Sequence, residues 1–498
     1  MIKLIYKTLA FSLVLTGMTS CAGDWLDRTP VDGVEDTEAI KSSSDLNTAR
    51  IGMYQILKGS STFPDYYGAR MFYYGDVRGE DMQNEASGSR TKTCYDFTYS
   101  TANNAPNMWQ VPYLVIGRAN RVIAAAEAGG LSDQETAQAI ISQYAAEARV
   151  VRALAHFDLV RIYGKTYTAD DGASLGVPVV TSVIDAEEKL PRNTVAEVYR
   201  QVITDLTDAI NSGALSTDAS SNVYMNVWAA KALLARVYLT MGENENALAV
   251  AEDVIKNSSY TLWSNAEYAG AWQETSSAHG KEILFEFAIT NSTDWTDREG
   301  IAYLYSEDGY ADAIVTKKFL DLLNEDPDDV RHSILVAPVK ADFIDKYKTN
   351  PVFMIKFGDT NSQDTDIRYN NIPLFRLSEV YLNAAEAAVK VGEQDKAYTY
   401  LDAIVNRANP TKHAASPVTL EAVLKERRKE LVGEGHRFFD AMRNNETIVR
   451  YTSTADQGWQ QALTEEARSF NRDFYKTLLP VPEYEMNANP EMKQNPGY

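Results

Sequence analysis

The chain ends in Leu479-Pro480-Val481-Pro482-Glu483-Tyr484-Glu485-Met486-Asn487-Ala488-Asn489-Pro490, and four residues later in Gln494-Asn495-Pro496-Gly497-Tyr498. Four prolines among these twenty residues exclude regular helix and favour extended chain and turns. A solvated tail does not normally carry leucine, valine, methionine and tyrosine between such helix breakers. We therefore expect residues 476–498 to pack back onto the body, so the fold must provide a surface that receives them.

Chain length and net charge limit the number of domains and the classes of partner to consider. Its 498 residues are enough for one large fold or two to four domains. The 69 acidic residues outnumber the 48 basic ones and give a formal net charge of -21, which argues against nucleic acid or anionic lipid as a partner. Tyrosine (29) is more frequent than phenylalanine (16), and because a buried tyrosine needs a partner for its hydroxyl, we expect some tyrosines at wet, ligand-facing surfaces.

Residues 1–20 have the pattern of a bacterial export signal. Lys3 and Lys7 precede an apolar run at residues 9–15, which is too short to span a bilayer. Mostly small residues then lead to Cys21, as in a lipobox, where the cysteine is acylated and becomes the first residue of the mature protein. Met18 stands where the lipobox usually has leucine.

The cysteine count agrees with a lipid anchor. The chain has two cysteines, Cys21 and Cys94, so acylation of the first leaves the second unpaired and excludes a disulfide framework. The alternative is a conventional signal peptide with an incidental cysteine. We predict lipidation of Cys21 and attachment to the membrane through that lipid.

Three stretches have the apolar spacing of amphipathic helices: residues 45–57, 109–128 and 145–164. The last is apolar on two sides and ends at Gly164, which predicts a helix buried among others.

An internal repeat follows. Residues 232–255 and 382–405 share a helix, a glycine turn (Gly242 or Gly392), an alanine five residues after the glycine, and a second helix. This pattern resembles the tetratricopeptide unit, and residues 109–164 fit as a degenerate third copy. The repeats predict a mainly α-helical fold whose core spans about 109–164, 193–258 and 372–410.

Long segments of another character separate the helices. They are rich in Gly, Asn, Asp, Ser, Thr and aromatic residues without a sustained period, and they cover about 59–108, 259–313, 338–371 and 444–475. Residues 282–289 form a candidate strand. Loops of this length usually carry function, so we predict that they form a ligand-binding lobe.

Several blocks resemble the SusD/RagB family, the surface lipoproteins that Bacteroidetes use to capture nutrients beside a TonB-dependent transporter. They are residues 147–164, 191–199, 372–386 and 426–443, together with the lipobox and the tail. The resemblance implies one SusD-like domain over residues 21–498 and a location at the outer membrane, facing the exterior. It also implies a SusC-like transporter as partner, over which the protein would close as a lid.

Catalytic signatures are missing from the sequence. It has no Gly-x-Ser-x-Gly elbow and no phosphate-binding loop, and its five histidines lack metal-site spacing, so we predict no catalytic residue, no metal and no cofactor. The densest charged cluster, residues 426–443, places opposite charges three and four positions apart. We interpret that spacing as surface ion pairs with a framework role rather than as an active site.

The aromatic loops suit carbohydrate, because sugars present flat C–H patches to aromatic rings and hydroxyls to polar side chains. SusD-like glycan binders assemble an aromatic arc from a loop before the first long helix pair and a loop after the middle strand. Trp295, just past the candidate strand, is the best single candidate. The others are Tyr95, Asn103, Arg70 and Tyr73 from the first loop segment and Trp272 and Tyr305 from the second, which also holds Tyr303 and Tyr310. For each aromatic residue the alternative is packing beneath its own loop.

The expected function is therefore non-catalytic capture of an oligosaccharide or polysaccharide and its delivery to a SusC-like transporter. A peptide ligand on the same fold, as in the RagB-like branch, is the first alternative. A glycosidase and a helical scaffold that binds only protein are two others. Nucleic acid is not expected as a partner.

Overall fold

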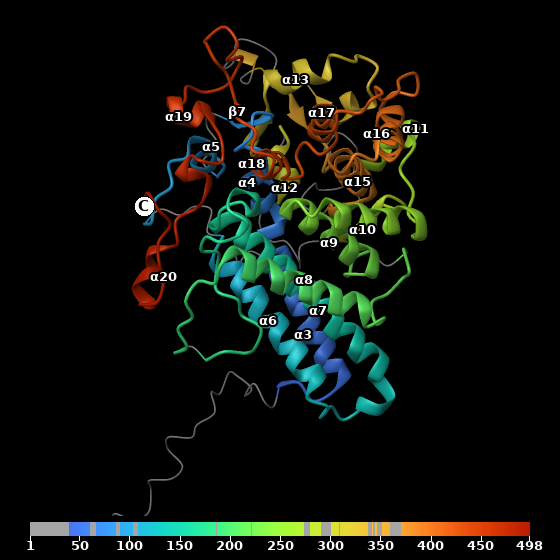
Figure 1. Ribbon diagram of the computed structural model, residues 1–498, viewed down its shortest axis with the longest axis vertical. Coiled ribbons are helices and arrows are strands. Elements are labelled where there is room, and N and C mark those ends of the chain that lie inside the picture. The colour runs from blue at the N-terminus through green and yellow to red at the C-terminus, as the bar shows by residue number, and fades with distance from the viewer. Residues whose placement is uncertain are drawn as a thin grey trace, which may run out of the picture.

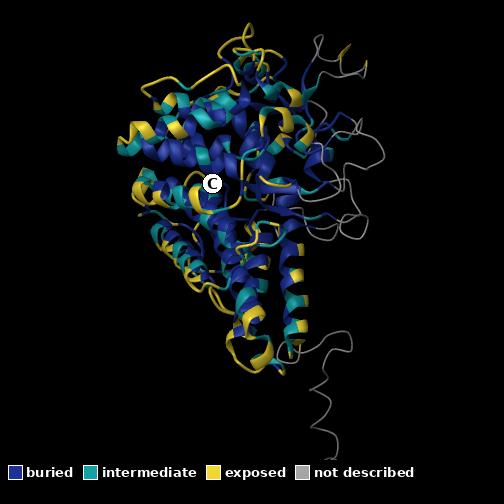
Figure 2. Cartoon of the chain, turned by 90° about the vertical axis from the view of Figure 1, so that its right-hand side faces the viewer, coloured by how far each residue is buried: buried dark blue, intermediate teal, exposed yellow. Residues whose placement is uncertain are grey.

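The computed structural model describes residues 39–498 except 60–65, 86–89, 103–107, 186, 221, 273–278, 290–299, 308, 337–340, 342–343, 346–350 and 359–369. Figure 1 shows two groups of helices. The lower half of the view holds α3 (Ser43–Lys58), α6 (Gln110–Glu127), α7 (Gln134–Tyr163) and α8 (Val195–Asn211), and the upper right holds α15 (Leu377–Val391), α16 (Gln394–Ala408) and α17 (Leu420–Glu430). One hydrophobic cluster includes residues of both groups, and Figure 2 shows buried chain in each. In the part of the chain that is described, no helix is both long and apolar enough to cross a membrane.

The first group contains α3 (Ser43–Lys58), α6 (Gln110–Glu127), α7 (Gln134–Tyr163) and α8 (Val195–Asn211). All three helices expected from apolar spacing are present, although α7 begins well before residue 145. The start of α8 is fixed by a capping box, in which the Thr194 hydroxyl accepts from the Glu197 amide and the Glu197 carboxylate accepts from the Thr194 amide.

Two helical hairpins confirm the repeat. The hairpin of α9 (Val227–Met241) and α10 (Asn244–Asn257) corresponds to the hairpin of α15 (Leu377–Val391) and α16 (Gln394–Ala408). Gly242 and Gly392 both adopt a φ of 82°, the left-handed conformation that ends each first helix. The alanines five residues later, Ala247 and Ala397, are fully buried, which lets the paired helices approach closely. Helix α10 packs on α15, so the two repeats stack directly.

Shorter elements connect and cover these helices. Four two-stranded antiparallel sheets are described: β1 (Met82–Asn84) with β3 (Ala313–Val315), β2 (Ile283–Phe287) with β6 (Ile372–Arg376), β4 (Leu335–Val336) with β5 (Phe353–Met354), and β7 (Ile448–Val449) with β8 (Ser469–Phe470). The short helical elements are η1 (Tyr66–Arg70), α4 (Met71–Asp76), α5 (Lys92–Asp96), η2 (Tyr167–Ala169), α11 (Asn265–Trp272), α12 (Ile301–Tyr305), α13 (Lys317–Leu323), η3 (Val330–Ile334), α17 (Leu420–Glu430), α18 (Arg437–Arg443), α19 (Glu465–Arg468), η6 (Tyr475–Thr477) and α20 (Glu483–Ala488). The candidate strand at 282–289 is therefore present as β2.

The C-terminal tail lies against α7 and the segment before α8. The Leu479 amide donates to the Ile162 carbonyl at 3.0 Å, and Asn495 Nδ2 donates to the Tyr163 carbonyl at 2.9 Å. Leu479 and Val481 are fully buried. The expectation that the prolines exclude helix is wrong for one turn: α20 fits between them because Pro482 occupies its N-cap position, where a missing amide hydrogen costs nothing.

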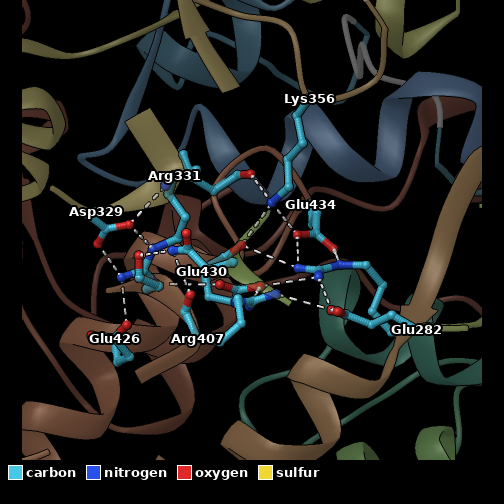
Figure 3. Close-up of polar contacts among 12 residues, drawn as sticks. Glu282, Asp329, Arg331, Lys356, Arg407, Glu426, Glu430 and Glu434 are labelled. Carbon is cyan, nitrogen blue, oxygen red and sulfur yellow. Dashed lines mark hydrogen bonds and ion pairs between the residues drawn. The ribbon is translucent and has the colours of Figure 1, made fainter. Parts of the chain in front are cut away.

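The charged cluster at 426–443 has a framework role, but the prediction of surface ion pairs is wrong. Glu430 of α17 is fully buried and contacts Arg331 of η3, Arg376 of β6 and Arg407 of α16 (Figure 3). Helix α17 directs the Glu430 carboxylate into the interior, toward cations from other elements. Local spacing could not show this, because the partners are distant in sequence.

The same network shifts the pKa values of its buried groups. Burial raises the pKa of the Glu430 carboxyl, but the charges of Arg407, Arg376 and Arg331 outweigh it and lower the pKa to about 2. Lys356 next to β5 donates to the Glu430 carbonyl at 2.8 Å, to the Val432 carbonyl at 3.0 Å and to the Glu434 carboxylate. Burial lowers the pKa of its ammonium to about 8, although Glu434 opposes this shift. The network thus ties η3, β5, β6, α16 and α17 together beneath the loops.

Candidate ligand-binding face

The two loop segments expected to form a common face lie side by side. Strand β1 of the first segment pairs with β3, which begins where the second segment ends, and the register places Asn84 opposite Ala313. Next to this ribbon, the Thr91 hydroxyl donates to the Asp312 carbonyl at 2.7 Å. Side chains from both segments therefore meet at one end of the β1–β3 ribbon.

Arg90, Tyr303, Tyr310 and Asp312 meet there, and we call them the Tyr303–Tyr310 cluster. The Arg90 guanidinium lies 3.7 Å from the centre of the Tyr310 ring, and Arg90 Nη1 donates to Asp312 Oδ2 at 3.1 Å. The rings of Tyr303 and Tyr310 meet edge to face, with centres 4.9 Å apart and planes at 82°. Both tyrosines and Arg90 are half-buried, so each keeps part of its side chain at the surface.

A tight turn holds the two tyrosines together. The Tyr310 amide donates to the Tyr303 carbonyl at 2.8 Å, and the Asp312 amide donates to the Leu304 carbonyl at 2.8 Å. A β-carbon at Gly309 would lie 1.9 Å from the Tyr303 carbonyl oxygen, so only glycine fits at this position. The backbone thus fixes the relative position of the rings before any ligand arrives.

The face is anchored below by Asp76 of α4. The Tyr305 hydroxyl of α12 and the Gly435 amide donate to Asp76 Oδ2 at 3.3 and 2.9 Å. Burial raises the pKa of the Asp76 carboxyl well above its ordinary value, and the Gly435 amide and the charge of Lys356 oppose this shift only in part. This contact joins the two loop segments a second time.

Chemically, the cluster combines partly exposed aromatic rings with a guanidinium and a carboxylate. Rings of this kind bind apolar patches, and the half-buried guanidinium donates hydrogen bonds to hydroxyls or carbonyls, while Asp312, which is 3% exposed, orients the guanidinium. Within the described residues, no group of three or more His, Cys, Asp or Glu side chains is placed to hold a metal ion.

Two of the seven predicted ligand residues, Trp295 and Asn103, lie outside the described residues. So does the lipidation candidate Cys21. Trp295 belongs to the segment that joins β2 to α12 in sequence, and α12 carries Tyr303 of the cluster.

Four other candidates are core residues, and the prediction that they face a ligand is corrected. Tyr95 is fully buried; its hydroxyl donates to Gln460 Oε1 at 3.2 Å, and the Arg450 guanidinium lies 4.4 Å from its ring centre. Tyr305 is 1% exposed and is held by Asp76. Both rings stabilise the loops from within.

Trp272 and Tyr73 are buried in the same way. Trp272 is 1% exposed and packs against Trp263, with ring centres 5.3 Å apart. Tyr73 of α4 is 4% exposed. Arg70, the seventh candidate, is half-buried at the end of η1. The loops contain enough aromatic area to build their own hydrophobic core, which is why aromatic content alone overestimates the ligand-facing set.

Sequence reasoning missed Arg90 and Asp312 as members of a site. It noted Tyr303 and Tyr310 among the loop aromatics but did not select them. Arg90 and Asp312 are 222 positions apart, and no local motif links them. Gly309, between the two tyrosines, was the available turn signal.

Comparison with known proteins agrees with the family resemblance in the sequence. The family model described as the SusD family matches residues 204–498. A second model, described as starch-binding and associating with the outer membrane, matches residues 24–239. Together they extend over most of the chain.

Known relatives match this chain over nearly its full length. The chain is 40% identical to a putative sugar-binding protein from Bacteroides vulgatus ATCC 8482, whose crystal structure superposes with a TM-score of 0.83 over 92% of this chain and 99% of that one. It is 36% identical to a SusD superfamily protein of the same strain, with a TM-score of 0.84 over 92% of this chain and 100% of that one. It is also 26% identical to SusD-like protein P2 of Formosa agariphila, over 99% of both chains. With its stacked helical hairpins and these matches, the chain belongs to the SusD family of non-catalytic binding proteins.

Proposed function

We propose that this protein captures an oligosaccharide or polysaccharide at the outer membrane and passes it to a SusC-like TonB-dependent transporter. The observation that carries the proposal is the Tyr303–Tyr310 cluster, in which two half-buried rings stand beside Arg90 and Asp312 at the junction of the two loop segments. The relative with 40% identity, described as a putative sugar-binding protein, supports the same ligand class.

In this proposal a sugar ring lies on the exposed part of Tyr303 or Tyr310, and its hydroxyls accept hydrogen bonds from Arg90, which the buried Asp312 carboxylate holds in place. Trp295 and Asn103 extend the surface from their two segments. Binding does not cleave the ligand. Weak contacts with single sugar units suffice, because a polymer engages several units at once.

The location follows from the N-terminal region. Residues 1–20 are removed on export, Cys21 carries the lipid, and residues 21–498 form one domain on the outer face of the outer membrane. The matched family model is described as associating with the outer membrane, which supports this placement. The transporter lies next to the binding protein, which closes over it as a lid.

Calorimetric titration tests the ligand class. The mature protein in detergent is titrated with a panel of plant, host and microbial glycans and with a mixed peptide pool. We expect heat with one glycan class, and no release of shorter products on incubation. Heat with the peptide pool alone that is lost in Tyr310→Ala would replace the glycan by a peptide ligand, and product release that depends on one carboxylate would make the protein a glycosidase.

Substitutions locate the site in the same experiment. We expect Trp295→Ala and Tyr310→Ala each to weaken glycan binding by about tenfold or more, which is about 1.4 kcal/mol. Trp295→Ala should leave the melting temperature unchanged, and Tyr310→Ala should stay folded although it loses the contacts with Arg90 and Tyr303. Tyr398→Ala is the matched control, because it removes a half-buried tyrosine ring from α16, outside the cluster. A loss below about twofold in both variants would remove the cluster and Trp295 from the site.

A further inference from the structure

A groove of about 560 Å³ opens between α6, the segment 178–190 and α20. Figure 1 labels α6 and α20 on the lower left of the molecule. We call it the α6–α20 groove. The described residues that line it come from α6, from the segment and from α20, and they include Leu114, Gly117, Val183, Ile184, Tyr484 and Glu485. None of these residues belongs to the Tyr303–Tyr310 cluster.

The floor of the groove is a face of α6 that lacks a side chain at its centre. Gly117 lies between Tyr113 and Arg121 on this face, and a β-carbon there would meet only Arg121 Nη1, at 3.8 Å. Glycine is among the weakest helix formers. Here neither helix–helix packing nor a positive φ requires it, so its effect is to leave the middle of the groove open.

The walls are fixed by side chains of the core. The Tyr113 hydroxyl donates to the Pro178 carbonyl at 2.9 Å, and Asn120 Nδ2 donates to the Ser182 carbonyl at 2.7 Å. On the other side, Asn489 Nδ2 donates to the Leu190 carbonyl at 2.9 Å. The groove is therefore preformed, as ligand sites usually are.

Exposed apolar side chains concentrate in this groove. In the described part of the chain, nine large hydrophobic side chains are exposed, and four of them line the groove: Leu114 (37%), Val183 (46%), Ile184 (38%) and Tyr484 (46%). Apolar surface gathered in a concave region marks an interaction site more often than scattered exposed residues do.

The lining also selects the chemistry of the occupant. The exposed aliphatic side chains Leu114, Val183 and Ile184 offer nothing to sugar hydroxyls, but they match aliphatic and aromatic side chains of a peptide. The ring of Tyr484 accepts either kind of ligand, so the aliphatic residues decide the preference. Three carboxylates, Asp185, Glu188 and Glu485, outnumber the cationic groups of Arg121 and Lys189 among the described lining residues. The whole chain carries a net charge of -21, so a basic occupant is favoured over an acidic one.

We propose that the α6–α20 groove binds a short peptide segment of a partner protein, with an aliphatic or aromatic anchor over Gly117 and a basic residue facing Asp185 and Glu188. The site is separate from the glycan face and does not depend on the ligand bound there. It gives the protein a second, protein-directed surface on the flank formed by its C-terminal tail.

Fluorescence anisotropy tests the proposal on the mature protein in detergent. The probe is a labelled hexapeptide library with lysine at both ends and two central positions varied over Leu, Ile, Phe, Tyr and Trp. We expect at least one member to bind with a Kd on the order of 10–100 μM. We also expect at least about tenfold weaker binding when glutamate replaces both lysines or serine replaces the central pair. No binding by any member up to about 1 mM, or equal binding of the glutamate peptides, would overturn the proposal.

A substitution that fills the groove tests the site, and a smaller substitution at the same position is its control. Gly117→Leu occupies the open floor and is expected to weaken peptide binding by about tenfold or more, whereas Gly117→Ala adds one methyl group in open space and retains most of the binding. Melting temperature and circular dichroism check that both variants fold. Peptide binding unchanged by Gly117→Leu in a folded protein would place the peptide elsewhere and overturn the proposal.

Hydrogen exchange separates this proposal from the glycan proposal. The lysine-flanked peptide is expected to slow amide exchange in 178–190 and 483–489, and the glycan is expected to leave these amides unchanged. Protection of these amides by glycan and not by peptide would make the groove a carbohydrate subsite instead. Failure of the glycan titrations leaves the peptide result untouched, so the two proposals fail independently.

Discussion

Arg192 and Asn495 lie 303 positions apart and are joined by a hydrogen bond of 2.9 Å from Arg192 Nη1 to Asn495 Oδ1. Arg192 also donates to the carbonyls of Tyr163, Leu175, Gly176 and Lys493, so the fold holds this guanidinium mainly with backbone oxygens. Burial lowers the pKa of the Arg192 guanidinium to about 10. This bond attaches the C-terminal tail to the body and shapes the flank on which α20 lines the groove.

Asn495→Ala should lower the free energy of unfolding by about 2–4 kcal/mol. The substitution removes the amide that donates to the Tyr163 and Leu479 carbonyls and deprives Arg192 of one acceptor in a buried site. Urea unfolding measures the loss. Asn487→Ala, at an exposed position of α20, is the control and should change stability by less than about 0.5 kcal/mol. Equal stability of the two variants would show that the tail is not fixed by Asn495.

Acid stability should depend on the buried carboxylates. Burial raises the pKa of the Glu386 carboxyl, but Arg443, Lys390 and Arg427 outweigh it and lower the pKa to about 2, against an ordinary value of 4.5. The unfolded chain therefore binds more protons than the folded chain between pH 4.5 and 2. This contribution to stability is complete above pH 4.5 and is lost as pH falls toward 2.

Glu386→Gln isolates this effect. At pH 7 it should destabilise the protein by about 2–4 kcal/mol, because it removes one of the two buried carboxylates that pair with Arg443 and leaves only Asp440. The difference from the unsubstituted protein should shrink as pH falls from 4.5 to 3, as measured by urea unfolding at each pH. Glu393→Gln, at an exposed position, controls for the change in total charge. A Glu386→Gln deficit that is constant with pH would contradict the assigned pKa.

Lys356 should make stability depend on pH in the alkaline range, as Glu386 does in the acid range. Its folded-state pKa of about 8 lies below its ordinary value of 10.5, so between these values the unfolded chain holds a proton that the folded chain has lost. Stability from this group therefore rises with pH above 8. Relative to Lys356→Met, the protein should gain about 1.5 kcal/mol between pH 8 and 9.5, with a slope that rises toward about 1.4 kcal/mol per pH unit. Lys412→Met, at an exposed position, should show no such trend. An unchanging difference between the protein and Lys356→Met would contradict the lowered pKa.

Local sequence predicted the scaffold because its determinants are local. Gly242 and Gly392, each followed five residues later by a buried alanine, define hairpins that need no distant partner to be recognised. The buried ion pairs and the candidate ligand site depend instead on residues that are far apart in the sequence. Arg376 meets Glu282 across 94 positions, and the hydroxyl of Tyr95 meets Gln460 across 365. A tyrosine that faces a ligand and one that packs beneath a loop have the same sequence context, and only the tertiary fold separates them.

Membrane attachment should depend on Cys21 alone. Cys21→Ala is expected to move the protein from the membrane fraction to soluble fractions, because the acylated cysteine supplies the only anchor proposed here. Cell fractionation with mass spectrometry of the mature N-terminus measures this. Cys94→Ala is the control: Cys94 is a fully buried free cysteine, and its loss should leave the protein in the membrane fraction. Continued membrane association of Cys21→Ala would contradict the lipid anchor.

Arg90 and Tyr310 should behave as one unit. The guanidinium lies 3.7 Å from the ring centre and is also held by Asp312, so removing either side chain removes the stacking interaction. In urea unfolding, a double-mutant cycle of Arg90→Gln and Tyr310→Leu should give a coupling free energy of about 0.5–2 kcal/mol. If the cluster binds glycan, Arg90→Gln should also weaken the titration by about three- to tenfold through a less firmly held Tyr310. Additive effects on stability would show that the stacked pair is not a unit, and coupling in stability without any effect on glycan affinity would leave Arg90 a structural partner of Tyr310 and remove it from the glycan site.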